Sequence, residues 1–175
     1  HCVTGVQTCA LPISAGGKMF VFRIDSTGNY DTSFNLTGKV TLTAVGSSSD
    51  MFDLTLDDLN RIVVGGVTST YAAIVRLNAN GSYDTTFATT GRKQVLIGGT
   101  ASTLSCLKID SLNSIVFVGS NTVTAQGINF YVARLTQAGV MDNTFNLNGY
   151  YSLPIGSGGV DDECESVSIL PDGRF

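Results

Sequence analysis

The sequence has no tryptophan, three prolines and a single histidine among its 175 residues. Because that histidine is His1, the chain offers no Ser-His-Asp or Cys-His arrangement and no metal site with several histidine ligands. Basic residues number 10 against 14 acidic ones and do not cluster, which argues against a nucleic-acid-binding surface. No apolar run approaches the roughly 20 residues needed to cross a bilayer, so we expect no membrane insertion.

A helical pattern is missing as well, since no apolar stripe recurs with the period of an α-helix. Instead, short runs rich in Val, Ile, Phe, Tyr and Thr alternate with turns rich in Asn, Asp and Gly. Glycine occurs 20 times and charged residues make up only 14% of the chain. This composition is typical of a turn-rich β protein and unlike that of a disordered or coiled-coil protein.

Three segments repeat one pattern, in which Arg, Gly, Asp and Phe hold the same relative positions. They are RIDSTGNYDTSF (Arg23 to Phe34), RLNANGSYDTTF (Arg76 to Phe87) and RLTQAGVMDNTF (Arg134 to Phe145), spaced by 53 and then 58 residues. A second pattern, FDLTLDDLNRIVVGG, recurs as LSCLKIDSLNSIVFVG, and the chain ends with VSILPDGRF, the start of a further copy. Repeats of about this length are typical of propellers and other repeat architectures.

Each repeat unit predicts four strands. In the middle unit we expect them at about Phe52 to Leu56, Ile62 to Gly65, Ala72 to Leu77 and Gln94 to Ile97, with a tight turn between the first two. The third strand is nearly continuously apolar in every copy, as expected where neighbouring sheets cover both of its faces. Units of four strands are typical of β-propeller blades. The predicted fold is therefore all-β, with about three four-stranded blades.

The number of blades predicts an open arrangement. A closed propeller has roughly 4 to 8 blades, so we expect an incomplete β-propeller or propeller-like arc. The last copy stops at Phe175, where the second strand of its unit would begin. We therefore expect residues 18–175 to be propeller repeats truncated at both ends, part of a longer chain.

The two repeated patterns together resemble the bacterial delta-60 repeat, a propeller-type repeat of unknown biochemical function. The resemblance covers nearly all of residues 18–175. Two departures stand out: Thr136 and Ala138 replace polar loop residues of the earlier copies, and Leu-Asn replaces the usual Asp-Gly in the turns at Asn60 and Asn113. A role that needs the same ligands on every blade is therefore not favoured.

The resemblance implies a structural and interaction module of a larger bacterial protein that is secreted or attached to the cell surface. Its partners would be an unidentified protein or glycan ligand, bound through loops on the blade rims, and the remaining blades of the intact chain. We expect no enzymatic activity and no cofactor, and we assign no catalytic, cofactor-binding or metal-binding residue. The alternatives are part of a propeller enzyme, such as a carbohydrate-active one, and a propeller stabilised by calcium.

In each copy the repeated arginine precedes the repeated aspartate by eight residues. The two can pair across the glycine-centred turn, or the aspartate can cap the turn through its own backbone. A ligand site on every blade is one interpretation. We favour a structural element of the blade, because the residues that recur in every repeat unit are those needed to pack one unit on the next. The repeated phenylalanines fit the same role, as anchors between sheets.

The same loops are the candidates for calcium. The first copy offers Asp25, Gly28 and Asp31; the second offers Asn78, Asn80 and Asp84, and the third keeps only Asp142. Calcium takes about six to eight oxygen ligands, and no copy has the spaced aspartates of a calcium-binding loop. We therefore do not predict a metal site there.

Unrepeated residues are the remaining candidates. The acidic run Asp161, Asp162, Glu163 and Glu165 is expected in a loop before a strand, where it can serve acid-base chemistry or simply be solvated, and we favour the second. Ser157, Gly158 and Gly159 do not open a helix, so they imply no phosphate site. The five extra residues of the third unit fall within SNTVTAQGIN, the best position for ligand specificity on a rim.

Two cysteines fall within the repeats. We expect Cys106 to be buried in an inner strand, and Cys164 to be a poor nucleophile because carboxylates surround it. A bridge between adjacent blades through these two residues has no support in the sequence.

The first 17 residues stand apart from the repeats. The segment VTGVQTCALPI, from Val3 to Ile13, resembles the translation of a common short-read sequencing adapter, so we interpret residues 1–17 as a non-native segment. A signal peptide is not favoured, because no basic residue precedes Lys18 and the apolar run ALPI is too short. This interpretation sets aside His1 and two of the four cysteines.

Overall fold

The computed structural model describes residues 9–15, 18–42, 49–155 and 160–175. Every regular element in these residues is a β-strand, which confirms the predicted all-β class. Among them, no helix offers the long apolar stretch of a membrane span. The strands are β1 (Cys9–Ala15), β2 (Lys18–Ile24), β3 (Lys39–Leu42), β4 (Ser49–Leu56), β5 (Ile62–Thr68), β6 (Tyr71–Leu77), β7 (Arg92–Val95), β8 (Ala101–Ser102), β9 (Cys106–Ile109), β10 (Ile115–Val123), β11 (Gly127–Leu135) and β12 (Tyr150–Leu153).

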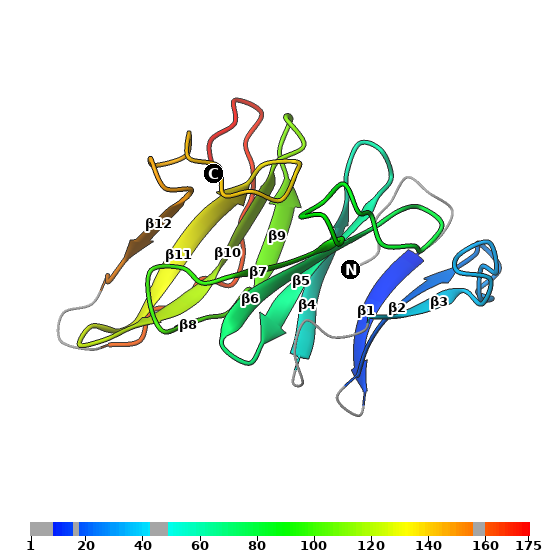
Figure 1. The fold of residues 1–175 in the computed structure, drawn as a ribbon, viewed down its shortest axis with the longest axis horizontal. Helices are drawn as coiled ribbons and strands as arrows, with labels where there is room; N and C mark the ends of the chain where they lie inside the picture. The colour runs from blue at the N-terminus through cyan, green and yellow to red at the C-terminus, as the bar shows by residue number, and fades with distance from the viewer. Residues whose placement is uncertain (1–8, 16–17, 43–48, 156–159) are drawn as a thin grey trace.

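The strands form three antiparallel sheets that follow one another along the molecule (Figure 1). The first sheet has the order β1-β2-β3 and the second β4-β5-β6-β7. In the third, β12-β11-β10 continues to β9 along one part of β10 and to β8 along another. The sheets thus form the predicted propeller-like arc, in which the first sheet corresponds to the second, third and fourth strands of a complete blade.

Strand β1 lies inside the segment that we interpret as adapter-derived. It pairs with β2 over its whole length, from Cys9 opposite Ile24 to Ala15 opposite Lys18. Residues 1–8, which include His1, lie outside the described residues. The origin of the segment stays a prediction, but part of it forms an edge strand of the first sheet.

The predicted strands of the middle unit are present: the first begins three residues earlier and the second ends three residues later than predicted, and the fourth is displaced as a whole by two residues. This strand is Arg92–Val95 in place of Gln94 to Ile97. Ile97 lies beyond its end, fully buried, and its backbone N–H donates to the Ser102 hydroxyl at 2.8 Å. Ile97 is therefore a core residue, as its apolar side chain indicates, but it does not belong to strand β7.

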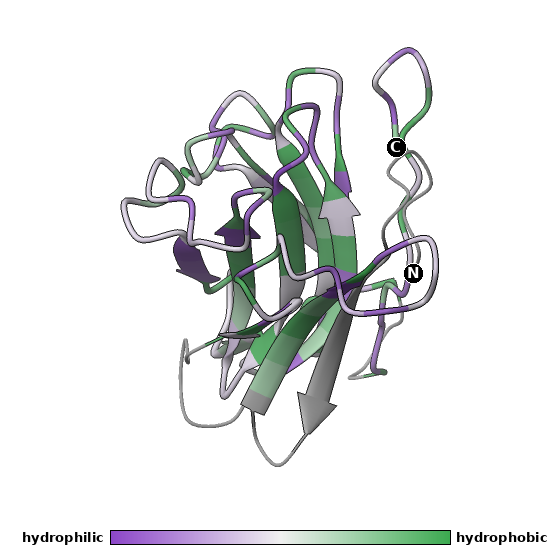
Figure 2. Ribbon diagram, turned by 90° about the vertical axis from the view of Figure 1, so that its right-hand side faces the viewer, coloured by the Kyte–Doolittle hydropathy of each residue, from purple (hydrophilic) through white to green (hydrophobic). Residues whose placement is uncertain are grey.

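The strands are mostly hydrophobic and the loops are more polar (Figure 2). One core cluster joins the first and second sheets, and another joins the second and third. From Ala72 to Leu77 every residue of β6 is buried, which confirms that neighbouring sheets cover both faces of this strand. Along β11 buried and half-buried residues alternate, because one face of the third sheet has less cover.

The strand registers define two ends of the molecule. Ile62 pairs with Leu77 and Ile115 with Leu135, so the tight turns that precede β5 and β10 lie at the same end as the loops that follow β6 and β11. We call this the loop end, and the opposite end, with the β5–β6 and β10–β11 connections, the hairpin end.

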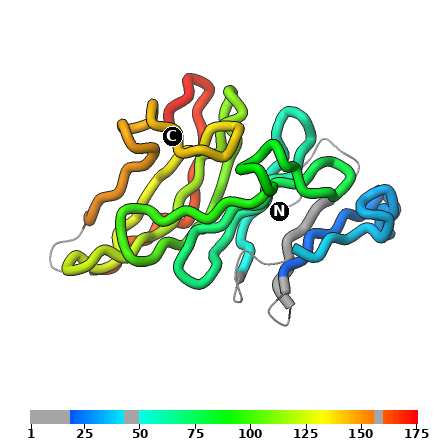
Figure 3. The backbone as a smooth tube through the Cα atoms, in the orientation of Figure 1, coloured from blue at the N-terminus to red at the C-terminus, as the bar shows by residue number. Residues whose placement is uncertain are grey.

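The C-terminal segment, residues 160–175, lies against β10 and β11 of the third sheet (Figure 3). The strand predicted before the last turn is not formed, because these residues have no ladder partner among the described residues. The turn itself forms, with the Leu170 N–H donating to the Arg174 carbonyl at 2.7 Å. Phe175 packs on Phe145 with ring centroids 5.4 Å apart.

Candidate functional site

The repeated Arg-Gly-Asp-Phe residues form three loops of one design. We call residues 23–38, 76–91 and 134–149 the first, second and third motif loops. In each, the Asp N–H donates to the Arg carbonyl, the Phe N–H to the Asp carbonyl, and the N–H of the last Gly to the Phe carbonyl, at 2.7 to 3.0 Å. The backbone thus folds back on itself and places the arginine and the aspartate side by side.

Both interpretations of the aspartate are correct at once. Its Oδ2 accepts from the arginine Nε at 2.8 Å in the first loop and 2.7 Å in the other two. Its Oδ1 accepts from the backbone N–H and the hydroxyl of the Ser or Thr two residues later, at 3.0 and 2.6 Å in every loop. The carboxylate therefore pairs with the arginine and caps the turn, and it keeps little capacity for a ligand.

The arginine also lies over the repeated phenylalanine. Its guanidinium carbon is 4.9 Å from the Phe34 ring centroid in the first loop, 4.8 Å from that of Phe87 in the second and 5.3 Å from that of Phe145 in the third. Phe34 and Phe87 are fully buried and belong to the two core clusters between sheets. This confirms the predicted anchor role for both, whereas Phe145 is only half-buried.

The first two motif loops reach the next blade. Arg23 Nη1 donates to the Ala79 carbonyl at 2.6 Å, and Arg76 Nη1 donates to the Gln137 carbonyl at 2.7 Å. A second bond follows each one, from the Asn35 N–H to the Asn80 carbonyl at 2.8 Å and from the Ala88 N–H to the Ala138 carbonyl at 2.9 Å. Each of these two loops thus donates two hydrogen bonds to the turn of the following loop.

The repeated glycine completes this contact from the other side. Gly81 and Gly139 have φ of +88° and +80°, and a Cβ there would lie 3.0 Å from Cε2 of Phe34 and 2.7 Å from Cε2 of Phe87, respectively. Glycine therefore serves both the turn and the close approach of the neighbouring ring. At Gly28, in the first loop, an added Cβ would meet nothing within 4 Å.

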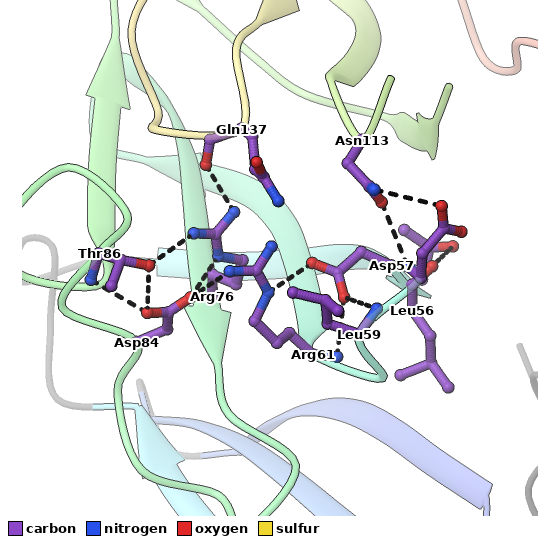
Figure 4. A network of polar contacts seen from close by, with 11 residues as sticks. Leu56, Asp57, Leu59, Arg61, Arg76, Asp84, Thr86, Asn113 and Gln137 are labelled. Atoms are coloured by element: carbon purple, nitrogen blue, oxygen red, sulfur yellow. Dashed lines mark hydrogen bonds and ion pairs between the residues drawn. The ribbon is translucent and has the colours of Figure 1, made fainter. Parts of the chain in front are cut away.

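A second arginine joins the second motif loop (Figure 4). Arg61 donates from Nε to Asp57 at 2.7 Å and from Nη1 to Asp84 at 3.1 Å, so Asp84 Oδ2 accepts from both Arg61 and Arg76. Asp57 and Asp84 are buried, and two positive charges balance the two negative ones. This network was not predicted from the sequence. The available signal was that Arg61 follows the turn in the second unit, where Ser114 stands in the third.

The surroundings shift the protonation equilibria of these loops. Burial acts to raise the pKa of Asp84, but hydrogen bonds from Thr86 and the charge of Arg76 outweigh it and hold that pKa below its usual range. The pKa of Asp142 is lowered chiefly by the hydroxyl of Thr144. Burial, followed by the neighbouring Arg61, lowers the pKa of Arg76. The carboxylates are therefore held in their ionised form.

The calcium candidates are used for turn formation. Asp25 Oδ1 accepts hydrogen bonds from the Thr27 N–H, the Thr27 hydroxyl and the Asn29 N–H. These bonds lower the pKa of Asp25, and the bond from the Thr27 hydroxyl has the largest effect. In the second loop, Asn78 and Asn80 both bond with Ser82. Within the described residues, no group of three or more His, Cys, Asp or Glu side chains could hold a metal ion.

The acidic run is spread over separate contacts. Asp161 accepts from the Ile128 N–H at 3.4 Å and Asp162 from the Ile155 N–H at 2.7 Å, so the structure ties both to backbone near the hairpin end. Glu165 lines a cleft of about 470 Å³ together with Phe52, Val67, Thr103 and Ser105. Glu165 is the sole acidic residue lining this cleft among the described residues. Ser157, Gly158 and Gly159 lie outside the described residues.

The five extra residues of the third unit lengthen the β10–β11 hairpin. The β5–β6 hairpin has seven paired positions, whereas the β10–β11 hairpin has nine. Asn121 is buried there, donating to the Ile97 carbonyl at 2.8 Å and accepting from the Ser152 hydroxyl at 2.9 Å. The insertion thus lies at the hairpin end, away from the motif loops, and part of it builds the third sheet.

The two cysteines of the repeats, Cys106 and Cys164, are both free thiols. Cys106 is buried in β9, as predicted. The pKa of Cys164 is raised, chiefly by burial and to a smaller extent by Cys106 and Glu165, a direction that agrees with the expected weak nucleophile while adding burial as the main cause.

Exposed leucines mark the loop end. Leu36 and Leu147 occupy equivalent positions in the first and third motif loops, are 89% and 92% exposed, and have φ of 60° and 64°. Leu59 and Leu112 occupy the tight turns before β5 and β10 and are 62% and 76% exposed. A role for these four residues was not predicted from the sequence. Large apolar side chains at exposed turn positions, two of them in a left-handed conformation, do not serve the core.

Two stretches, residues 60–87 and 113–145, match a family model described as a domain of unknown function (DUF5122), beta-propeller. Each stretch runs from the tight turn through two strands to the phenylalanine of a motif loop. The chain carries β-propeller-type repeats of unknown function. The matched propeller repeats contain the arginine, glycine, aspartate and phenylalanine of the second and third motif loops. No curated protein matches the chain.

Proposed function

We propose that this chain is a structural and interaction module, a run of propeller blades that are held together by their motif loops and that bind a partner through loops at the rim. The observation that carries the structural part is the use of the repeated residues. The arginine, glycine, aspartate and phenylalanine of the second loop all take part in contacts within the blade or with its neighbours. Because the polar groups of the repeat are already engaged in contacts within the chain, the repeat stabilises the scaffold, and ligand binding depends on other residues.

The placement of the acidic residues supports a binding module over a propeller enzyme. Acid-base catalysis on glycosides uses a pair of carboxyl groups that flank one site. Asp161 and Asp162 accept hydrogen bonds from backbone amides, and Glu165 lines the cleft without a second acidic residue among the described residues. Calcium-stabilised blades have less support, because the Asp25 carboxylate already accepts three hydrogen bonds through one oxygen.

The loop end is the proposed binding surface. Leu36, Leu59, Leu112 and Leu147 present apolar side chains from three successive units at this end. Apolar groups on exposed turns favour a protein ligand over a glycan, since protein interfaces bury such groups in their centre. The delta-60 resemblance adds the proposed setting, a larger bacterial protein that is secreted or held at the cell surface.

The structural part is tested by comparing Arg76→Met with Arg134→Met. Removing the Arg76 head group leaves Asp84 buried with one partner fewer and the Gln137 carbonyl without its donor, so we expect a loss of about 3 kcal/mol in the free energy of unfolding. The same change at Arg134 removes only contacts within its own blade and should cost about 1 kcal/mol. Urea unfolding measures both. Equal effects would contradict an inter-blade role, and a neutral Arg76→Met that changed ligand binding would favour a ligand site.

The binding part is tested with a variant in which Leu36, Leu59, Leu112 and Leu147 are all replaced by serine. We expect its unfolding curve to match that of the parent chain, because these side chains make no core contact. Capture of proteins from a bacterial surface extract, compared with binding to a glycan array, then shows the ligand class. Glycan binding that survives the four replacements would contradict a leucine-based protein interface.

A further inference from the structure

Strand β4 is an edge strand of the second sheet, and it contains a β-bulge. Met51 pairs with Gly66 and Asp53 pairs with Gly65, so Phe52 is an extra residue with no ladder partner on β5. A bulge turns the extra side chain out of the regular alternation of its strand, and bulges are frequent beside functional sites. Phe52 is 55% exposed although it lies within a strand.

The third sheet has a bulge at the equivalent position. Residues 103–105, between β8 and β9, lie opposite residues 119–120 of β10, so this edge segment also has one extra residue. Ser105 follows Phe52 by 53 residues, which is the spacing of the repeat between these two units. The bulge is therefore a feature of the repeat unit, and the residue that occupies it differs from unit to unit.

A repeated glycine opposite each bulge makes room for it. A Cβ at Gly66 would collide with the carbonyl oxygen of Asp50, and a Cβ at Gly119 would collide with that of Thr103. Both glycines belong to the second repeated pattern, in the runs VVGG and VFVG. This part of the repeat thus serves to bring the bulged edge segment close to the neighbouring strand.

The bulge residues line one cleft. Phe52 and Ser105 line the cleft of about 470 Å³ described above, together with Glu165. Glu165 precedes the turn residue Gly173 by eight positions, as Ser105 precedes Asn113. Three successive units therefore supply a ring, a hydroxyl and a carboxylate from one position of the repeat. The volume lies within the roughly 300–1,000 Å³ of sites for small ligands.

The neighbouring residues hold the two bulges together. Asp53 Oδ2 accepts from the Leu107 N–H at 2.9 Å and from Lys108 Nζ at 3.5 Å, which links β4 to β9. The hydroxyls of Thr103 and Ser120 are 2.9 Å apart and hydrogen-bonded. The cleft is thus formed before a ligand arrives, which lowers the ordering cost of binding. The positive charge of Lys108 is paired with Asp53.

The chemistry of the lining favours a cation that carries an apolar group. The face of an aromatic ring such as that of Phe52 attracts cations, and the Glu165 carboxylate accepts strong hydrogen bonds from charged donors. Asp50 and Glu163, each two residues before a bulge position, are exposed and add negative charge to this edge. Among the described residues, no lysine, arginine or histidine lines the cleft.

We propose that this cleft binds an ammonium group on an apolar body, supplied by a free organic amine or by a lysine side chain of a partner. Phe52 packs on the apolar body and faces the charge, Glu165 accepts from the ammonium, and the Ser105 hydroxyl accepts a further hydrogen bond. This site goes beyond the proposed function, because it lies near the hairpin end and does not include the exposed leucines of the loop end.

The test is calorimetric titration of the full chain with n-butylammonium chloride, with n-butanol as the neutral analogue of the same shape. We expect saturable binding of n-butylammonium with a Kd of about 1 mM and binding of n-butanol at least about tenfold weaker. Added sodium chloride should weaken the ammonium binding. Equal binding of the two probes, saturable binding of methyl glucoside alone, or no saturable binding would overturn the proposal.

Single substitutions locate the site. Glu165→Gln and Phe52→Leu should each weaken n-butylammonium binding about fivefold. The matched control Glu163→Gln removes the same charge outside the lining and should change binding by less than about twofold. All three side chains are exposed, so the unfolding curves of the variants should match that of the parent chain. Cleft variants that bind like the parent, or a control with the same loss as Glu165→Gln, would contradict the site.

A capped Gly-Lys-Gly peptide distinguishes the two sources of the ammonium group. Tighter binding of the peptide than of n-butylammonium supports a lysine of a partner, whereas equal or weaker binding supports a free amine. The variant with four leucines replaced by serine should bind n-butylammonium like the parent chain. A loss of binding in that variant would show that the cleft is not a separate site, whatever the outcome for the loop-end surface.

Discussion

The second and third motif loops have almost the same internal geometry and different surroundings. In both, the arginine Nε to aspartate Oδ2 distance is 2.7 Å and the aspartate caps its Thr in the same way. The second loop is closed by Arg61 and by the Gln137 carbonyl, whereas the third faces outward. The loop therefore forms from contacts within its own blade, and the neighbouring blade adds burial and two further bonds.

Phe87→Ala against Phe145→Ala is the largest expected contrast. Phe87 is fully buried between two sheets, so its truncation should cost about 3–5 kcal/mol through lost burial and the cavity left behind. Phe145 is half-buried, and its loss should cost about half as much. Chemical denaturation of both variants measures the difference. Equal costs would mean that the third loop is as well covered as the second.

The glycine comparison has the next largest effect. Gly139→Ala introduces a Cβ 2.7 Å from the Phe87 ring, in a backbone with φ of +80°. We expect a cost of about 1–2 kcal/mol from the left-handed backbone and about 1–3 kcal/mol more from overpacking. Gly28→Ala should show only the backbone cost, because nothing lies within 4 Å of its added Cβ. The excess at Gly139, measured by thermal unfolding at low protein concentration, reports the inter-blade contact directly.

The acid dependence of stability sharpens the comparison. The pKa of Asp84 and that of Asp142 are both lowered in the folded chain. Their contribution is therefore present above the unfolded value of about 4 and is lost as the pH falls through the lower folded values. Thr86→Val and Thr144→Val should each cost about 1 kcal/mol at neutral pH, and this cost should shrink progressively as the pH falls below the unfolded value of about 4.

Unfolding curves of the two threonine variants at several pH values check this expectation. The parent chain is the control at each pH. A cost that does not change as the pH is lowered towards acid unfolding would assign the effect to threonine packing and not to the charged carboxylate.

The smallest expected effect concerns the exposed leucines of the loop end. Leu147→Asn relieves a left-handed backbone that asparagine tolerates better, and it removes no core contact. We expect a gain of a few tenths of a kcal/mol in the free energy of unfolding. Thr89, the equivalent residue of the second loop with φ of 63°, is the matched control site for the same change. A clear loss at Leu147 would show that its side chain contacts the fold.

The repeats made the fold predictable from the sequence. The three Arg-to-Phe segments fixed the blade count, and the apolar third strand correctly indicated burial on both faces. Even the exchange of Asp-Gly for Leu-Asn in the turns agrees with the structure, since Asn60 and Asn113 take the left-handed conformation that Gly173 has in the last copy.

The site was less predictable, because it depends on contacts between residues far apart in sequence. The hydrogen bond from Arg76 to the Gln137 carbonyl joins residues 61 positions apart and its acceptor is a backbone atom, so no pattern of side chains predicts it. Arg61 was not predicted for a related reason: it occurs in one unit only, whereas a repeat pattern indicates the residues that the units share. The exposed leucines were missed because hydrophobicity in a β protein is first taken as a sign of the core.

The motif-loop donors point from the first loop to the second and from the second to the third. Other bonds between the second and third sheets run the opposite way, from the Leu107 N–H to Asp53 and from the Ser102 N–H to the Thr70 carbonyl. The junction between these sheets is therefore held by donors from both sides, and its opening should release both sets at once. We expect the Ala88 and Leu107 amides to exchange with solvent hydrogen at similar rates, as members of one cooperative unit.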